Sequence, residues 1–254
     1  MEVLHDAVPE GQTDSQGNAT EALKAAGIPV QGYSEEQIFR RFRMPNRKKE
    51  QVQYELTRDP GLLHQYYLMR ENMYISVWGL DNFHGSHDAF DEISDICIAK
   101  LGNQCIGGGR MTYSSPGHRL LLPMEGEDFS LTQALPQLEL HRHTYLEFSR
   151  LAILPEFQYR ETSVELYDCA LRHAIRRGAR YGFALAPHLL ARKYCQGVSS
   201  IGYKASIRRD VKVPDREEYE GIPMALWVLD FAESPAVQKL HEAVKTHESA
   251  LAEA

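Results

Sequence analysis

The segment LEFSRLAIL, residues 146–154, places two charged side chains inside a run that otherwise has the pattern of a buried β-strand. Its apolar residues leave no continuous solvent face, so Glu147 and Arg150 must either lose their water or lie at a cleft. An unpaired buried charge costs several kcal/mol, so an internal ion pair between two strands is one interpretation and a functional site is the other. Residues three apart on a regular strand face opposite sides. The two charges therefore share one site only if the backbone between them is irregular, or if each faces a different part of that site.

The composition indicates an ordinary globular protein with a substantial core. The chain has 254 residues, of which 43% are hydrophobic, a length that suits one domain with extensions or two small domains. Its formal net charge of -7 argues against a general nucleic-acid binder, which needs a broad phosphate-neutralising surface. Neither a long apolar run nor a signal-peptide pattern is present, so a cytoplasmic location is expected.

The cysteines and histidines give little support for metal or redox chemistry. The four cysteines lack C-x-x-C spacing, and we expect reduced thiols in the core; a redox or metal role is the alternative. His141 and His143 form an H-x-H pair that suits zinc, but no third ligand follows at a recognised spacing. We therefore predict no metal site. The cysteines are Cys97, Cys105, Cys169 and Cys195.

Four segments are expected along the chain. Residues 1–33 are rich in small polar residues and predict a flexible N-terminal tail. Residues 34–58 combine the amphipathic pattern SEEQIFRRFRM with the basic stretch MPNRKKEQ, which predicts a helix and a linker. A central domain is expected over residues 59–232, and residues 233–254 have the pattern of a capped C-terminal helix.

Within the central domain the periodicity alternates between helix and strand. A helical pattern follows Asp59-Pro60, and two strand-like runs then flank Gly102-Asn103, a pair that favours a tight hairpin turn. The later segments predict a strand, a helix ending near Gly178, a strand, a helix and two further strands. This order indicates an α/β fold with a mixed central sheet and helices on both faces.

The polar residues of the central domain occur in a distinctive order. The order resembles the pattern of the acyl-homoserine-lactone (autoinducer) synthases, which includes R-x-x-x-F, a Trp, D-x-[FY]-D, an Arg in a strand, a Phe and E-x-S-R. Residues 149–205 also resemble the core of the wider GNAT superfamily of N-acyltransferases. The residues that carry the resemblance are Arg70, Tyr74, Trp78, Asp88, Asp91, Arg110, Phe129, Glu147 and Arg150.

The resemblance implies a GNAT-like acyltransferase domain over residues 59–232. In such folds the strand that carries the Glu is splayed from its neighbour, often with a bulge, so that acyl donor and acceptor meet there. After Arg110 the chain reads MTYSSP where lactone synthases tend to have R-x-x-P-T, which looks closer to the N-acyl amino acid synthases. We therefore expect acyl transfer to the amine of an amino acid. The alternatives are a quorum-sensing lactone synthase that uses S-adenosylmethionine and a non-catalytic acyl-binding module.

The loop after the central strand departs from the superfamily pattern. That pattern is Q/R-x-x-G-x-G/A, in which glycines let backbone N–H groups approach a coenzyme A pyrophosphate. Glu161 stands here at the first glycine and would repel a pyrophosphate. The resemblance thus implies acyl carrier protein as the donor and partner, with its phosphopantetheine thioester as co-substrate and no tightly bound cofactor. The single phosphate of that arm would be bound by Gln158, Arg160, Thr162 and Ser163.

The site residues have expected roles. Glu147 is the candidate base for the acceptor ammonium, because burial raises the pKa of a carboxyl group. Arg110 and Arg150 are expected to pair with the acceptor carboxylate or to hold Asp88 and Asp91. A capped turn and ordinary helix packing are the structural alternatives for several of these residues. The expected substrate-binding residues are Arg70, Tyr74, Trp78, Asp88, Asp91 and Phe129.

Further residues are weaker candidates. Tyr194 is a candidate acid for the leaving thiolate, although its spacing to Gly202 is longer than usual for the superfamily. Apolar residues of the last strands would line an acyl tunnel or simply form the core. An acidic carrier protein would dock on basic side chains. The tunnel candidates are Ile222, Met224 and Leu226, and the docking candidates are Arg40, Arg41, Arg43, Arg47, Lys48 and Lys49, or Arg176, Arg177 and Arg180.

Overall fold

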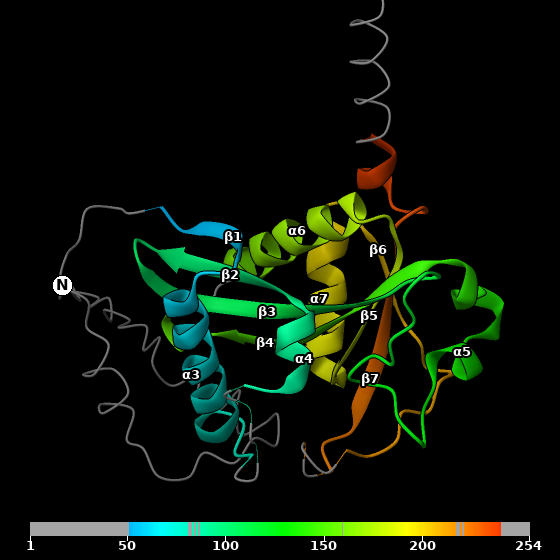
Figure 1. Cartoon of the computed structure of the whole chain (residues 1–254), viewed down its shortest axis with the longest axis horizontal. Helices are drawn as coiled ribbons and strands as arrows, with labels where there is room; N and C mark the ends of the chain where they lie inside the picture. Colours follow the sequence, from blue (N-terminus) through cyan, green and yellow to red (C-terminus); the bar gives the residue numbers. More distant parts are fainter. Residues whose placement is uncertain are drawn as a thin grey trace, which may run out of the picture.

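The computed structural model describes residues 51–239 apart from residues 81, 82, 84, 86, 159, 217, 218 and 220. These residues form a seven-stranded sheet in the order β1-β2-β3-β4-β5-β7-β6, in which only β4 and β5 run parallel (Figure 1). The expected mixed sheet is thereby confirmed. The strands are β1 (Gln53–Thr57), β2 (Asp95–Leu101), β3 (Gln104–Ser114), β4 (Thr144–Ile153), β5 (Ala179–Pro187), β6 (Lys204–Ile207) and β7 (Met224–Asp230).

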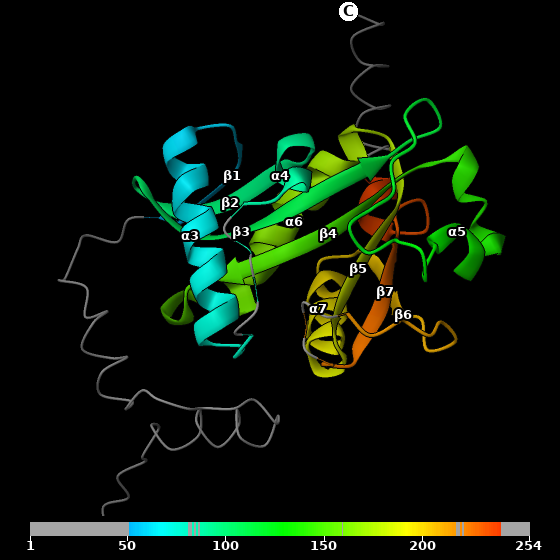
Figure 2. The same cartoon turned by 60° about the horizontal axis from the view of Figure 1, so that its bottom comes forward.

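Helices cover both faces of the sheet, as expected. Helix α3 (Pro60–Ser76) lies over β3 and β4 on one face, and α6 (Arg160–Arg176) and α7 (His188–Ser200) lie on the other (Figures 1 and 2). The apolar core is accordingly divided into separate layers, one beneath α6 and α7 and one beneath α3. A further cluster packs under the loops near α5 (Leu131–Ala134). The remaining short elements are α4 (Ala89–Ile93) and three 3-10 turns at Pro136–Leu138, Leu140–Arg142 and Pro155–Phe157.

Local signals in the sequence account for the ends of several elements. Asp59 caps α3 by accepting a hydrogen bond from the Leu62 amide at 2.9 Å, and Pro60 takes the first helical position. Gly102 adopts φ +59 in the turn between β2 and β3, which confirms the expected hairpin. Gly178 follows α6 with φ +75, a conformation that favours glycine and ends the helix where predicted.

The structure corrects one expected boundary. Residues 53–57, assigned to the linker, form the edge strand β1, which pairs with β2. The conformation of a five-residue edge strand depends on its partner strand, and so few residues show no clear alternation of apolar and polar side chains. The sheet therefore begins earlier than residue 59. Residues 235–239 are helical, consistent with the expected C-terminal helix, whereas the expected tail and the helix over 34–49 lie outside the described residues.

The strand that contains Glu147 is irregular in two respects. Its pairing with β3 shifts between Gly108 and Arg110, and Arg150 has φ 58 in the left-handed region. Its pairing with β5 ends at Glu147 opposite Phe183, although both strands continue beyond this point. The irregular backbone that Glu147 and Arg150 require is therefore present, and β4 and β5 diverge directly after Glu147.

We predict that Gly108→Ala destabilises the fold by about 1–3 kcal/mol through overpacking. A Cβ at this position would lie 2.6 Å from the ring of Tyr66, which is fully buried and whose hydroxyl donates to the Arg150 carbonyl. Urea unfolding measures the change. Gly117→Ala is the matched control, because its Cβ would meet no atom within 4 Å. Equal unfolding midpoints for the two variants would contradict this account of Tyr66.

Candidate active site

A cavity of about 730 Å³ opens where β4 and β5 diverge. Its wall includes Tyr74 from α3 and Trp78 just after this helix on one face of the sheet, and Tyr167 from α6 and Tyr194 from α7 on the other. The cavity therefore passes through the layer of the sheet. Its charged lining residues are Asp88, Arg110, Glu147, Arg150, Asp215 and Arg216, whereas Leu166, Ala170, Ala184 and Ala186 belong to its apolar part.

A buried ion pair supports the cavity from behind. Arg70 is fully buried and binds both carboxylate oxygens of Asp91 at 2.9 and 2.7 Å, and its Nε donates to the Gly85 carbonyl. Asp91 also accepts from Arg110 at 3.2 Å. Burial alone would raise the pKa of Asp91, but the hydrogen bonds and charge of Arg70 lower it below its usual value. Arg70 and Asp91 do not line the cavity, so their geometry is that of a support.

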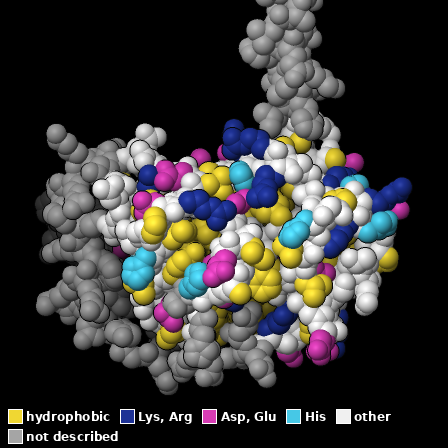
Figure 3. All heavy atoms as spheres, viewed as in Figure 1, with side chains coloured by type: hydrophobic (Ala, Val, Ile, Leu, Met, Phe, Trp, Pro, Cys, Tyr) yellow, Lys and Arg dark blue, Asp and Glu magenta, His cyan; other side chains and the backbone are white. Residues whose placement is uncertain are grey.

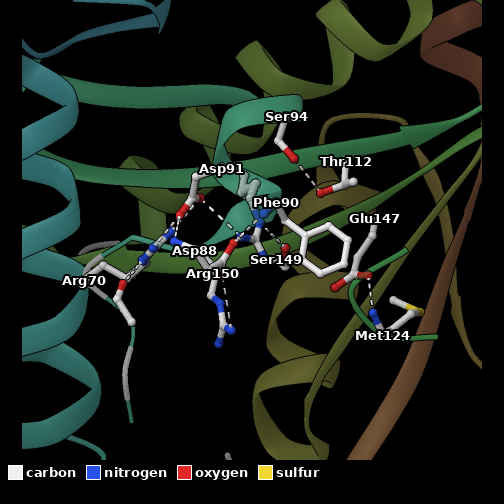
Figure 4. A network of polar contacts seen from close by, with 12 residues as sticks. Arg70, Asp88, Phe90, Asp91, Ser94, Thr112, Met124, Glu147, Ser149 and Arg150 are labelled. Carbon is white, nitrogen blue, oxygen red and sulfur yellow. Dashed lines mark hydrogen bonds and ion pairs between the residues drawn. The ribbon is translucent and has the colours of Figure 1, made fainter. Parts of the chain in front are cut away.

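The support continues to the cavity wall through a second pair of residues. Arg110 donates to Asp88 and, at 3.2 Å, to the hydroxyl of Ser149. Asp88 also lies 3.6 Å from the guanidinium of Arg150. Asp88 and Asp91 form a capping box at the start of α4, so the expected capped turn and the expected ion pairs are both present. Figure 4 shows this alternating chain of arginines and aspartates.

Two tyrosines of α3 hold the irregular part of β4. Tyr66 donates to the Arg150 carbonyl at 2.7 Å, and Tyr74 lies 3.5 Å from the Leu151 carbonyl. The guanidinium of Arg150 lies 4.8 Å from the centre of the Phe83 ring, which stacks on Tyr74. The position of Arg150 is thus determined by the bulge, by Asp88 and by an aromatic face.

Glu147 is 4% exposed and lies in the cavity wall. One carboxylate oxygen accepts a hydrogen bond from the Met124 amide at 2.7 Å (Figure 4). Burial is the largest influence and raises the pKa of Glu147 to about 7, although the Met124 amide and the nearby arginines act in the opposite direction. A carboxyl group with this pKa exchanges a proton close to neutral pH, which is what a general base requires.

The loop between β6 and β7 contributes residues that were not predicted. Arg216 donates to the Met124 carbonyl, and Tyr219 lies 3.4 Å from Arg150; both residues line the cavity. Asp215 of the same loop lines it as well. The segment has a charged, irregular sequence with no motif, so only its position after β6 brings it to the site.

A second cavity of about 350 Å³ lies between α6 and α7. It shares Tyr167 and Tyr194 with the first cavity, and its wall also includes Ser163 and Lys193. Of the three phosphate-binding candidates whose side chains are described, Gln158, Thr162 and Ser163, only Ser163 lines this cavity. Gln158 donates to the Ile153 carbonyl at 2.8 Å, and Thr162 is buried. The Arg160 side chain is not among the described parts of the chain.

Other expected residues lie away from the main cavity. Phe129 is buried in the cluster near α5 and does not line the cavity. Of the three tunnel candidates only Met224 lines it; Ile222 and Leu226 pack in the cores on the α3 side of the sheet and near α5.

The cysteines and histidines show no metal centre in the described part of the chain. The four cysteines are free thiols; Cys97 and Cys105 lie in the core as predicted, whereas Cys169 and Cys195 are only half-buried. Residues 51–239, with the gaps given above, contain no group of three or more His, Cys, Asp or Glu side chains placed to hold a metal ion. None of the helices in these residues has the length and apolarity of a membrane span.

The basic residues near the end of α6 are largely paired within the protein. Arg177 binds Asp95, and Arg180 binds Asp230. On the face seen in Figure 3, basic side chains are interspersed with acidic and apolar ones. The other docking candidates, residues 40–49, lie outside the described residues.

Solved structures match the chain along most of its length. FeeM, an N-acyl amino acid synthase from uncultured soil microbes, matches with a TM-score of 0.53 and 14% identity over 74% of this chain and 97% of its own. BjaI, a coenzyme A-dependent acyl-homoserine lactone synthase, matches with a TM-score of 0.53 and 12% identity over 77% of this chain and 90% of its own. The chain has the fold of these two acyltransferases. The fold expected from the sequence resemblance is thus confirmed, although no protein-family model and no curated protein sequence matches the chain.

We predict that Asp91→Asn lowers the free energy of unfolding by about 3 kcal/mol or more, because Arg70 and Arg110 lose the carboxylate that neutralises them. Guanidinium unfolding measures the loss. The same substitution at Asp210, an exposed residue that pairs with Arg208, is the control and should change the stability little. If both variants lose the same stability, the buried pair is not the support described here.

Proposed function

We propose that the protein is an N-acyltransferase that moves a fatty acyl group from a phosphopantetheine thioester to the amine of an amino acid. The observation that carries the proposal is the position of Glu147: a buried carboxyl group with a pKa of about 7, in the wall of a cavity, where β4 and β5 diverge. Two proteins that share the fold support the proposal: FeeM is an N-acyl amino acid synthase, and BjaI is a coenzyme A-dependent acyl-homoserine lactone synthase.

The acyl donor is proposed to enter through the smaller cavity between α6 and α7. Tyr167 and Tyr194 border both cavities, so an arm that passes them reaches the gap between the strands. Beyond Glu147 the edge of β4 that faces β5 is no longer covered by β5, and an extended pantetheine chain fits such an edge. The acyl chain then occupies the apolar part of the larger cavity, beside Ala170, Ala184 and Ala186.

The amino acid acceptor is proposed to bind at the charged end. Its carboxylate pairs with Arg150 and Arg216, two guanidinium groups in the cavity wall, and its ammonium faces Glu147. Arg110 is already occupied by Asp88, Asp91 and Ser149, so its proposed role is to hold these groups in place. The aromatic side chains of Tyr74 and Trp78 border the remaining space.

The reaction then needs three proton transfers: one from the acceptor ammonium, one from the attacking amine and one to the leaving thiolate. Glu147, as the carboxylate, takes a proton from the acceptor ammonium, and the neutral amine attacks the thioester carbonyl carbon. The tetrahedral intermediate collapses with cleavage of the carbon–sulfur bond and loss of the second amine proton, which yields an amide and a thiolate; this proton replaces the one that the acid gives to the thiolate. Tyr194 is the candidate to protonate the thiolate, since it borders both cavities. Burial keeps this hydroxyl protonated by raising its pKa.

An acyl carrier protein is proposed as the donor in preference to free coenzyme A. Glu161 is exposed in the first turn of α6, two residues before Ser163 in the wall of the smaller cavity. A carboxylate at this point repels a pyrophosphate more strongly than it repels the single phosphate of a carrier-bound arm. Comparison of the two donors at equal acyl length decides between them.

We predict that Glu147→Gln lowers kcat/KM by about 100-fold or more, the usual contribution of a general base. In the wild type, kcat/KM should rise with pH through about 7, because Glu147 must be ionised to accept the proton; the variant should lose this rise. Mass spectrometry of purified protein with acyl-carrier substrate and amino acids measures the product.

Glu92→Gln is the matched control, since Glu92 is exposed on α4 and does not line the cavity. If the products are instead acyl lactones formed from S-adenosylmethionine, the acceptor is S-adenosylmethionine and not an amino acid. Absence of any acyl product would leave only an acyl-binding role. Full activity of Glu147→Gln would show that another group accepts the proton.

A further inference from the structure

Trp227 stands out in the apolar part of the cavity. It lies on β7, is 1% exposed and belongs to the cavity wall. Its ring centre lies 5.8 Å from that of Tyr167 and 6.5 Å from that of Tyr194, the two residues that border both cavities. Its partners on the adjacent strands are Ala184 of β5 and Ile207 of β6, and the small side chain of Ala184 leaves room beside the indole.

The indole N–H of Trp227 is buried and has no hydrogen-bond acceptor among the described residues. A buried donor without an acceptor is costly, and tryptophan N–H groups usually find a partner when they are buried. A phenylalanine would fill a similar apolar position without this cost. The buried N–H therefore points to an acceptor atom that a ligand brings into the cavity.

We infer that Trp227 is a specificity-determining residue that donates a hydrogen bond to an oxygen on the third carbon of the acyl chain. The inference rests on the proposed function. If the thioester sulfur lies beside Tyr194, an oxygen on the third carbon is four bonds away, or about 5 Å in an extended chain. This reach is comparable with the 6.5 Å between the rings of Tyr194 and Trp227.

The chemical consequence is selection among acyl chains of equal length. A 3-hydroxy or 3-oxo chain satisfies the indole N–H, whereas a saturated chain leaves it unpaired in an apolar wall. Sites with a buried hydrogen-bonding group reject analogues that lack the matching atom. A residue that only packed against the chain would bind all three chains similarly.

The experiment compares three acyl-carrier substrates with ten-carbon chains: saturated, 3-hydroxy and 3-oxo. We expect the wild type to favour an oxygenated chain by about tenfold in kcat/KM, the size of one well-made hydrogen bond. Trp227→Phe should bring this ratio close to one. Because the ratio is taken within one variant, partial loss of folded protein does not affect it.

Trp78→Phe removes the only other tryptophan, at the acceptor end of the cavity, and should keep the chain preference of the wild type. A wild type that uses all three chains equally well overturns the inference without recourse to any variant. A preference that survives in Trp227→Phe also overturns it. Absence of transfer from all three chains refutes the proposed function itself, so the two failures are distinguishable.

Discussion

The candidate site depends on a set of buried charges that neutralise one another. Arg70 on α3 holds Asp91 on α4, and Asp91 in turn orients Arg110 on β3. Asp88 then connects Arg110 to Arg150 on β4. These hydrogen bonds and ion pairs connect α3, the capped turn at α4, β3 and β4, which lie apart in the sequence. Desolvation makes such a set costly unless every member is paired, and here the pairing also fixes the geometry of the cavity wall.

The same constraint explains why two charges occur within one apolar strand. The bulge turns Arg150 toward Asp88, and the hydroxyl of Tyr66 holds the carbonyl at that point. Glu147 lies just before the bulge, where β5 leaves β4, and among the described residues its hydrogen-bond donor is the Met124 amide. The bulge thus separates Arg150, which pairs with Asp88, from Glu147, which remains able to take up a proton.

Much of the fold follows from local signals in the sequence. The turn at Gly102, the cap at Asp59 and the end of α6 at Gly178 each combine a residue type with a backbone conformation that it favours, so these boundaries were predictable. Strand β1 was not, because its conformation depends on pairing with β2. Short edge strands contain too few residues for a period to be recognised.

The sequence identified many of the residues that form the site, but it did not show which of them line the cavity and which lie behind its wall. The ordered polar residues identified Glu147, Arg150, Arg110 and Asp88, all of which line the cavity. Arg70 and Asp91 were expected to contact the acceptor, yet they lie behind the wall, because a sequence pattern does not distinguish a residue that touches a ligand from one that supports it. Arg216 had no signal at all, since a loop is brought to the site only by the completed fold.

The central claim is that burial beside the cavity raises the pKa of Glu147 to near neutral pH. Carbon-13 NMR of protein labelled at the glutamate carboxyl groups, with Glu147→Gln to assign the signal, measures this pKa directly. The account predicts a midpoint near 7. A midpoint near 4.5, the ordinary value for a glutamate, would mean that the carboxyl group is well solvated and would contradict its role as a buried base.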